Sequence, residues 1–183
     1  MKKIIKEYGL LFSVASIIVT LDQITKAIVR ANIPFGGRWM PLDWLMPYFR
    51  LVHWDNTGAA FGLFQGGGLI FGALAVIVSI LIVIYYPQIP QDEKLMRVAI
   101  SMQMGGSIGN LIDRVVFGPV TDFISVGTFP VFNIADASIT VGVGILILAL
   151  WLSERKEKAK GADMDRVSDE MNYENSESEN YQS

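Results

Sequence analysis

Cysteine is absent from the 183-residue chain, and His53 is its only histidine. Without cysteine, disulfides, thiolate catalysis, cysteine-ligated zinc and thiol lipidation are all excluded. A single histidine rules out a multi-histidine metal site. Because His53 lies in an aromatic neighbourhood, we interpret it as a packing or hydrogen-bonding residue. The sequence therefore predicts neither a bound metal nor a cofactor.

Charge is also scarce: 18% of the residues are charged, and 51% are hydrophobic. Soluble domains carry about 25% charged residues. The stretch 56–91 holds no charge at all, whereas 153–183 holds five basic and nine acidic residues. The net charge of −3 is therefore a property of this tail. The rest of the chain shows no dense basic patch, so a nucleic acid partner is not expected.

Long apolar stretches are the main positive feature, since about 20 apolar residues cross a bilayer as a helix. The stretches cover residues 8–29, 69–86, 95–116 and 136–152. We therefore predict an all-α polytopic membrane protein with four transmembrane helices, whose membrane domain is 1–152. The alternative for the first stretch is a cleavable signal peptide. No small-x-small cleavage site follows it, and three further stretches favour an integral protein.

The segments between the spans differ in character. Nine Lys and Arg residues flank the spans on the side of the N-terminus and only three lie on the other side, so both termini are expected in the cytoplasm. The outer segment 33–64 is rich in Gly, Pro and aromatic residues and predicts a small β element at the membrane interface. The polar, acidic segment 153–183 is expected to be a disordered cytoplasmic tail.

The polar residues of the spans and loops gather near the predicted outer face. They are Asp22, Lys26, Asn56, Asn110, Asp113, Arg114, Asp122, Asn133 and Asp136. Some have a purely structural explanation, because Asp22 and Lys26 are spaced to pair on one helix face and Asp136 suits a helix start. Taken together on one side of a membrane, where charge is costly, they favour a functional site.

Because the chain has no cysteine and a single histidine, carboxylates are the reactive groups that remain. Asp122 and Asp136 are separated by thirteen residues, a loop long enough to fold back and bring them together. Two close carboxylates share one proton, so one can activate water while the other polarises a carbonyl. The pair therefore suggests an aspartic protease.

Five short motifs in this order resemble those of bacterial lipoprotein signal peptidase, the signal peptidase II family. They are 21–26 (LDQITK), 56–62 (NTGAAFG), 105–114 (GGSIGNLIDR), 120–124 (VTDFI) and 132–136 (FNIAD). The resemblance spans about residues 8–152. It implies a four-helix aspartic endopeptidase of the bacterial inner membrane, with a small extracytoplasmic β platform and an interfacial helix. Its substrate would be a diacylglyceryl-modified prolipoprotein, cut just before the lipidated Cys, within membrane lipid.

The same resemblance implies roles for individual residues. Asp122 and Asp136 would be the catalytic dyad. Asn56, Asn110, Arg114 and Asn133 would hold the substrate backbone or the dyad. Asp22 and Asp113 would support helix packing beside the site. The glycines at 105, 106 and 109 allow close approach of either a neighbouring helix or the substrate.

Two other functions are compatible with a membrane protein of this composition. A transporter or proton channel would spread polar groups through the membrane depth, whereas here the inner halves of the spans are largely apolar. A non-enzymatic scaffold would tolerate the loss of Asp122 or Asp136. The motifs favour the peptidase over both.

Overall fold

The computed structural model describes residues 2–58 and 67–180. It consists of two units, residues 1–146 and 147–183, and the site discussed below lies wholly in the first. The later part of the 56–62 motif and the end of the predicted β segment 33–64 lie outside the described residues.

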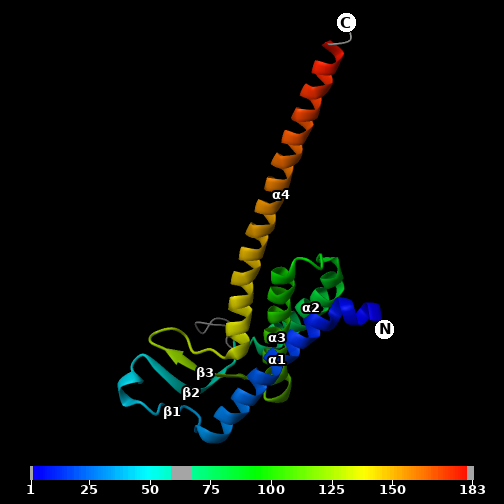
Figure 1. Ribbon diagram of the computed structural model, residues 1–183. Helices are drawn as coiled ribbons and strands as arrows, with labels where there is room; N and C mark the ends of the chain where they lie inside the picture. Colours follow the sequence, from blue (N-terminus) through cyan, green and yellow to red (C-terminus); the bar gives the residue numbers. More distant parts are fainter. Residues whose placement is uncertain (1, 59–66, 181–183) are drawn as a thin grey trace. The chain divides into compact units, whose positions relative to one another are not determined.

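Long helices carry most of the described chain (Figure 1). They are α1 (Lys2–Asn32), α2 (Gly68–Tyr85), α3 (Lys94–Val116) and α4 (Ile134–Asn180), with a short 3-10 turn, η3 (Tyr86–Gln88), after α2. Within the described ranges, three segments are long and apolar enough to span a membrane: Glu7–Asn32, Gly68–Gln88 and Ile134–Lys158. They coincide with the first, second and fourth predicted spans. The chain is a multi-pass membrane protein.

Helix α3 differs from the other helices in composition. Its 23 residues measure about 34 Å, enough to cross a bilayer core of about 30 Å. It carries Lys94, Arg97, Asp113 and Arg114 and is not among the three apolar segments, so the count of four spans stays a prediction. The position of α3 explains why it can carry these polar residues, because it packs against both α1 and α2. Many of its polar side chains are therefore buried in protein.

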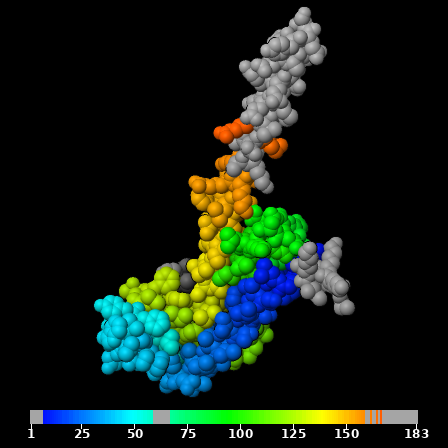
Figure 2. Space-filling view, viewed as in Figure 1, coloured from blue at the N-terminus to red at the C-terminus, as the bar shows by residue number. Residues whose placement is uncertain are grey.

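A small antiparallel sheet accompanies the helices, in the order β1-β2-β3. Its strands are β1 (Arg38–Trp39), β2 (Phe49–Asn56) and β3 (Val120–Val126), with a 3-10 turn, η1 (Asp43–Leu45), between the first two. In Figure 2 the residues of β1, η1 and β2, in light blue to cyan, form one end of the first unit. The β element predicted within 33–64 is thus confirmed. The third strand, which the sequence did not predict, comes from the connection between α3 and α4.

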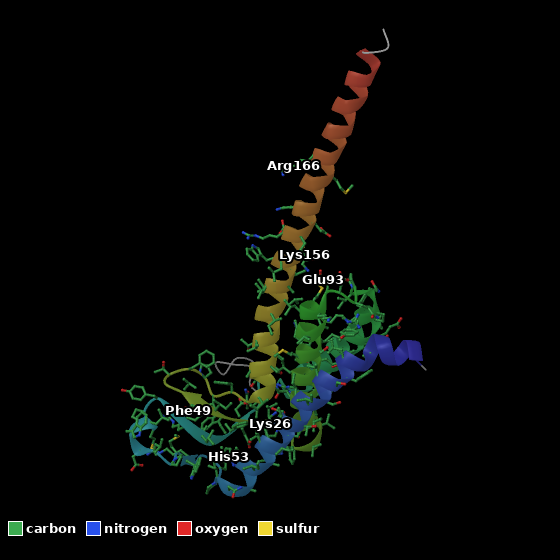
Figure 3. All side chains as sticks on the ribbon, viewed as in Figure 1. Lys26, Phe49, His53, Glu93, Lys156 and Arg166 are labelled. Carbon is green, nitrogen blue, oxygen red and sulfur yellow. The ribbon has the colours of Figure 1, made fainter. Side chains whose placement is uncertain are left out.

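The pairing of β2 with β3 contains a bulge next to Asp122. Leu51 pairs with Ile124 and Trp54 pairs with Asp122, so two residues of β2 lie opposite one residue of β3. Such bulges turn a strand locally and re-aim its side chains. One of these two residues of β2 is His53, whose Nδ1 lies 2.8 Å from the carbonyl oxygen of Ile33. His53 therefore ties β2 to the end of α1 (Figure 3).

Two apolar clusters fix the sheet and helices of the first unit. Leu11 and Ala15 of α1 pack with Tyr86 and Met104. At the other end of α1, Val29 and Ile33 pack with Phe123 of β3. The second cluster holds β3 against α1, and therefore holds its neighbour Asp122 in place.

The glycines of the 105–114 motif lie where helices approach most closely. A Cβ on Gly105 would lie 2.9 Å from Ile18 Cβ, and one on Gly106 would lie 2.5 Å from the carbonyl oxygen of Ala135. Gly105 thus faces α1, and Gly106 faces the start of α4. Of the two interpretations of these glycines, the contacts support close helix packing.

Helix α4 continues into the segment that was expected to be a disordered tail. It extends to Asn180, and the second unit begins at residue 147, a few residues before the predicted boundary after residue 152. Glu, Lys, Ala and Met favour helix, and Lys158 forms a 2.6 Å ion pair with Glu154 one turn earlier. These local preferences favour helix in a segment of polar, acidic composition.

Candidate active site

Asp122 lies in the middle of β3 and is almost fully buried, with 2% of its surface exposed. Its Oδ2 accepts a hydrogen bond of 2.9 Å from Asn56 Nδ2, and its Oδ1 accepts one of 2.7 Å from Asn133 Nδ2. Asn56 is the last residue of β2, so the sheet itself brings this amide to the carboxyl group. Both amides orient the carboxyl group without adding charge.

Burial, and after it the nearby charge of Asp136, raises the pKa of Asp122 to about 7. The hydrogen bonds from Asn56 and Asn133 act against this shift, because they favour the ionised form. Asp122 therefore keeps a proton up to neutral pH, far above the range of an exposed aspartate.

Asp136 lies in the first turn of α4 and is half-buried. Its Oδ1 accepts a hydrogen bond of 2.8 Å from Asn110 Nδ2, and its Oδ2 accepts one of 3.2 Å from the backbone N–H of Asn133. The positive end of a helix dipole favours a negative charge at this position. Asp136 thus accepts two N–H donors within the first turn of a helix.

Asn133 connects the two aspartates. Its side-chain Nδ2 donates to Asp122, while its Oδ1 accepts a 2.9 Å hydrogen bond from the backbone N–H of Asp136. Asn133 has no exposed surface. The two carboxyl groups, separated by thirteen residues in the chain, are therefore held by one residue, Asp122 by its side chain and Asp136 by its backbone N–H.

Both aspartates line one cavity of about 440 Å³. Asn56, Asn110 and Arg114 line it as well, and most of the remaining wall is apolar, from Phe71, Val120, Phe129, Val131, Phe132 and Ile139. A mostly apolar cavity with a few convergent polar groups is typical of a binding site. Its lining suits an apolar peptide or a lipid chain beside a pair of carboxyl groups.

Arg114 occupies the border between this cavity and a second groove between α2 and α3. Its guanidinium lies 5.5 Å from the ring centroid of Phe71, and its Nη1 is 3.5 Å from the carbonyl oxygen of Asn110. The half-buried guanidinium places a positive charge beside the carboxyl groups.

Asp22 and Asp113 lie behind the cavity in a buried cluster of charges. The ammonium of Lys26 lies 2.8 Å from Asp22 Oδ2 and 3.0 Å from Asp113 Oδ2, and none of the three side chains is exposed. Arg30 Nη1 is 3.7 Å from Asp113 Oδ1, so two acids face two bases. A buried charge is tolerated when it is paired in this way.

The structure thus brings the eight predicted site residues into one region. Five line the cavity, and the buried Asn133, Asp22 and Asp113 contact these residues or their neighbours. Sequence reasoning left Lys26 out of the site, as a mere partner of Asp22. It also missed Gln23, whose Nε2 donates to Gly109 O at 3.0 Å and to Asp113 Oδ1 at 3.2 Å. The 21–26 motif contains both residues, and a polar run inside an apolar helix is the signal that could have identified them.

A metal ion does not fit the arrangement of donors. In the described part of the chain, no group of three or more His, Asp or Glu side chains could hold one. The carboxyl groups are instead satisfied by amide and ammonium donors.

A family model described as signal peptidase (SPase) II matches residues 14–152, most of the chain. The chain belongs to the signal peptidase II family. Lipoprotein signal peptidases of Shouchella clausii and Moorella thermoacetica are each 38% identical to it, over 148 and 138 residues. These alignments cover 80% and 75% of this chain, and 96% and 90% of the two relatives. The resemblance inferred from the five motifs is confirmed.

Solved structures agree with this assignment to the signal peptidase II family. A bacterial membrane enzyme determined by the in meso method at 2.3 Å resolution matches with a TM-score of 0.73 and 34% identity, over 80% of this chain and 90% of that chain. A second, at 1.9 Å resolution, matches with a TM-score of 0.69 and 35% identity, over 78% and 92%. Membership of this family makes the chain a membrane peptidase and favours that function over a transporter or a scaffold.

Proposed function

We propose that this chain is an aspartic endopeptidase that removes the signal peptide from diacylglyceryl-modified prolipoproteins, cutting just before the lipidated Cys. Its relatives are named lipoprotein signal peptidases. The observation that carries the aspartic mechanism is the pair Asp122 and Asp136, which share Asn133 and line one cavity. No cofactor or metal takes part in this proposal.

The two carboxyl groups divide the chemistry between them. Asp136, at the positive end of α4, takes a proton from water as the water oxygen attacks the scissile carbonyl carbon. Asp122, protonated up to about pH 7, donates a hydrogen bond and then its proton to the carbonyl oxygen. As the tetrahedral intermediate collapses, Asp136 gives its proton to the leaving amine of the Cys and the C–N bond breaks. The remaining O–H proton returns to Asp122, which restores the starting state.

The amides and Arg114 suit the handling of an extended peptide. Asn56 and Asn110 reach the cavity wall and also hold the carboxyl groups. Arg114 lies at the border of the cavity, where its guanidinium can hold a substrate carbonyl. The apolar wall receives the side chains around the cut and the lipid on the Cys.

The proposed setting is the bacterial inner membrane. α3 serves as the fourth span, enclosed by α1 and α2, so its polar side chains face protein rather than lipid. With both termini in the cytoplasm, as the Lys and Arg distribution predicts, the aspartates lie towards the outer face. The substrate, a signal helix with a lipid, then arrives laterally through the bilayer.

The test is cleavage of a purified diacylglyceryl prolipoprotein by the full chain and by Asp122→Asn and Asp136→Asn. Loss of a general acid or base costs about 10²–10⁴ in rate, so each variant is expected to lose at least a hundredfold. The matched control is Asp92→Asn, since Asp92 is exposed in the connection before α3. Normal cleavage by either dyad variant disproves the mechanism. Equal cleavage of a substrate without lipid disproves the proposed substrate class.

A further inference from the structure

Lys26 is a lysine of α1 with no exposed surface, and its three N–H donors all have partners (Figure 3). They are Asp22 Oδ2 at 2.8 Å, Asp113 Oδ2 at 3.0 Å and Asn110 Oδ1 at 3.0 Å. An ammonium group offers three donors and no acceptor, so these contacts use its full capacity. The partners come from α1 and α3, and Asn110 in turn contacts Asp136.

The two carboxylates that hold Lys26 also hold the backbone beside each proposed catalytic aspartate. Asp22 Oδ1 accepts a 3.0 Å hydrogen bond from the backbone N–H of Ala135, which directly precedes Asp136. Asp113 Oδ2 accepts one of 3.0 Å from the backbone N–H of Thr121, which directly precedes Asp122. Lys26 bridges the two carboxylates, so it links the start of α4 to strand β3.

The contact with Asn110 has a second consequence, because it decides which way that amide points. Asn110 Oδ1 accepts from Lys26 and, at 3.1 Å, from Asn133 Nδ2. Its Nδ2 is thereby directed to Asp136 Oδ1. An amide that turned over would place an oxygen against the carboxylate of Asp136 and an NH2 group against an ammonium, two repulsive contacts.

We propose that Lys26 is a positioning residue of the peptidase, which holds the segments that carry Asp122 and Asp136 together and keeps the Asn110 amide turned towards Asp136. This rests on the proposed function of the two aspartates. Lys26 does not touch the substrate. The charged groups around it are Asp22 on α1, Asp113 on α3 and Arg30 on α1 next to Asp113. The charge of Lys26 also acts on Asp122 of β3, whose pKa it lowers. Lys26, Arg30, Asp22 and Asp113 together are electrically neutral.

A single Lys26→Met substitution would leave two buried carboxylates with one base and would endanger folding. The double variant Lys26→Met with Asp22→Asn avoids this, because it removes one charge of each sign. The amide oxygen that Asp22→Asn introduces can still accept the hydrogen bond from Ala135, and Arg30 remains beside Asp113. The lost element is the ammonium contact with Asn110. Asp22→Asn alone serves as the reference, since it keeps that contact.

The experiment measures kcat and KM of purified variants between pH 4 and pH 9 on a diacylglyceryl prolipoprotein. Relative to Asp22→Asn, the double variant is expected to lose about 10- to 100-fold in kcat, as supporting residues do in metal sites, with KM within about twofold. The shape of its pH profile is also expected to change, because the Asn110 amide that contacts Asp136 is no longer held in one orientation. A loss of packing alone would reduce the active fraction and leave the shape of the profile unchanged.

The matched control is Lys158→Met with Glu154→Gln, which removes an exposed pair of the same spacing and is expected to change nothing. A second variant, Lys26→Arg, keeps every carboxylate paired but presents a planar group, so it is expected to lower kcat without raising KM. If the double variant and Lys26→Arg both keep the kcat and pH profile of their references, the proposal is wrong. If Asp136→Asn also cleaves normally, the proposed dyad is wrong as well. If the two Lys26 variants keep their activity while Asp136→Asn is inactive, the role of Lys26 is refuted and the proposed dyad stands.

Discussion

Asn133 and Asp136 exchange two hydrogen bonds at the start of α4. The backbone N–H of Asn133 donates to Asp136 Oδ2 at 3.2 Å, and that of Asp136 donates to Asn133 Oδ1 at 2.9 Å. This is the reciprocal arrangement of a capping box, with a carboxylate three residues after the cap. The same Asn133 side chain reaches Asp122, so one residue both begins a helix and joins the two aspartates.

These two roles of Asn133 can be separated by substitution. Ser caps a helix about as well as Asn but is too short to reach Asp122, whereas Ala does neither. Asn133→Ala is therefore expected to lower the free energy of unfolding by about 0.5–2 kcal/mol more than Asn133→Ser does. Both variants are expected to lose cleavage activity by at least tenfold. Thermal unfolding and single-turnover cleavage measure the two effects, and a fully active Asn133→Ser would contradict the link to Asp122.

The pH profile of cleavage tests the protonation of Asp122. Its pKa of about 7 predicts that activity falls as pH rises through that region, because the carboxyl group loses the proton it needs to donate. Asn56 donates a hydrogen bond that lowers this pKa. Asn56→Ala is therefore expected to move the alkaline limb to higher pH, whatever it does to the maximal rate. Asn32→Ala, an exposed asparagine on α1, is the control, and an unmoved limb in Asn56→Ala counts against the assignment.

The same raised pKa makes a prediction about stability. Between the pKa of an unfolded aspartate, near 3.8, and about 7, the folded chain binds more protons at Asp122 than the unfolded chain does. The contribution of this group to stability is therefore full below pH 4 and falls as pH rises to 7. Asp122→Asn removes the dependence. Its Tm relative to the wild type is expected to be higher at pH 8 than at pH 5, and a constant difference across this range would refute the prediction.

Gly109 tests the close packing of α3 against the buried charges. A Cβ at this position would lie 2.7 Å from Asp22 Oδ2 and 3.2 Å from Asp22 Cγ. Gly109→Ala is therefore expected to destabilise the fold by about 1–3 kcal/mol, because α1 must shift. Gly144→Ala is the control, since nothing lies within 4 Å of its position, and it is expected to stabilise α4 slightly. Equal thermal stability of the two variants would show that the contact is not tight.

Chelation tests the absence of a metal from the mechanism. The described carboxyl groups accept from amide and ammonium donors and do not form a set of metal ligands. Cleavage by the purified chain is therefore expected to be unchanged by an excess of EDTA. Inhibition that added metal reverses would require a different mechanism.

Much of the fold could be predicted because its signals are local. Apolar stretches of membrane-spanning length predicted α1, α2 and α4, and the Gly, Pro and aromatic segment predicted β structure. Strand β3 could not be predicted in this way, because a seven-residue strand is defined by its pairing with β2 rather than by its own sequence. Helix α4 extends to Asn180, whereas the disorder expected for 153–183 from its acidic, polar composition stays a prediction.

For the site, the sequence determined which residues were available. With no cysteine and one histidine, aspartates and amides were the remaining candidates, and the five motifs placed them in a known family. The tertiary structure decided how they meet. Asn133 can join Asp122 to Asp136 only because a bulged sheet and a helix start converge, and Lys26 gains its place because α1 and α3 pack through glycine. Such contacts depend on distances between segments far apart in the chain, and no local pattern in the sequence encodes those distances.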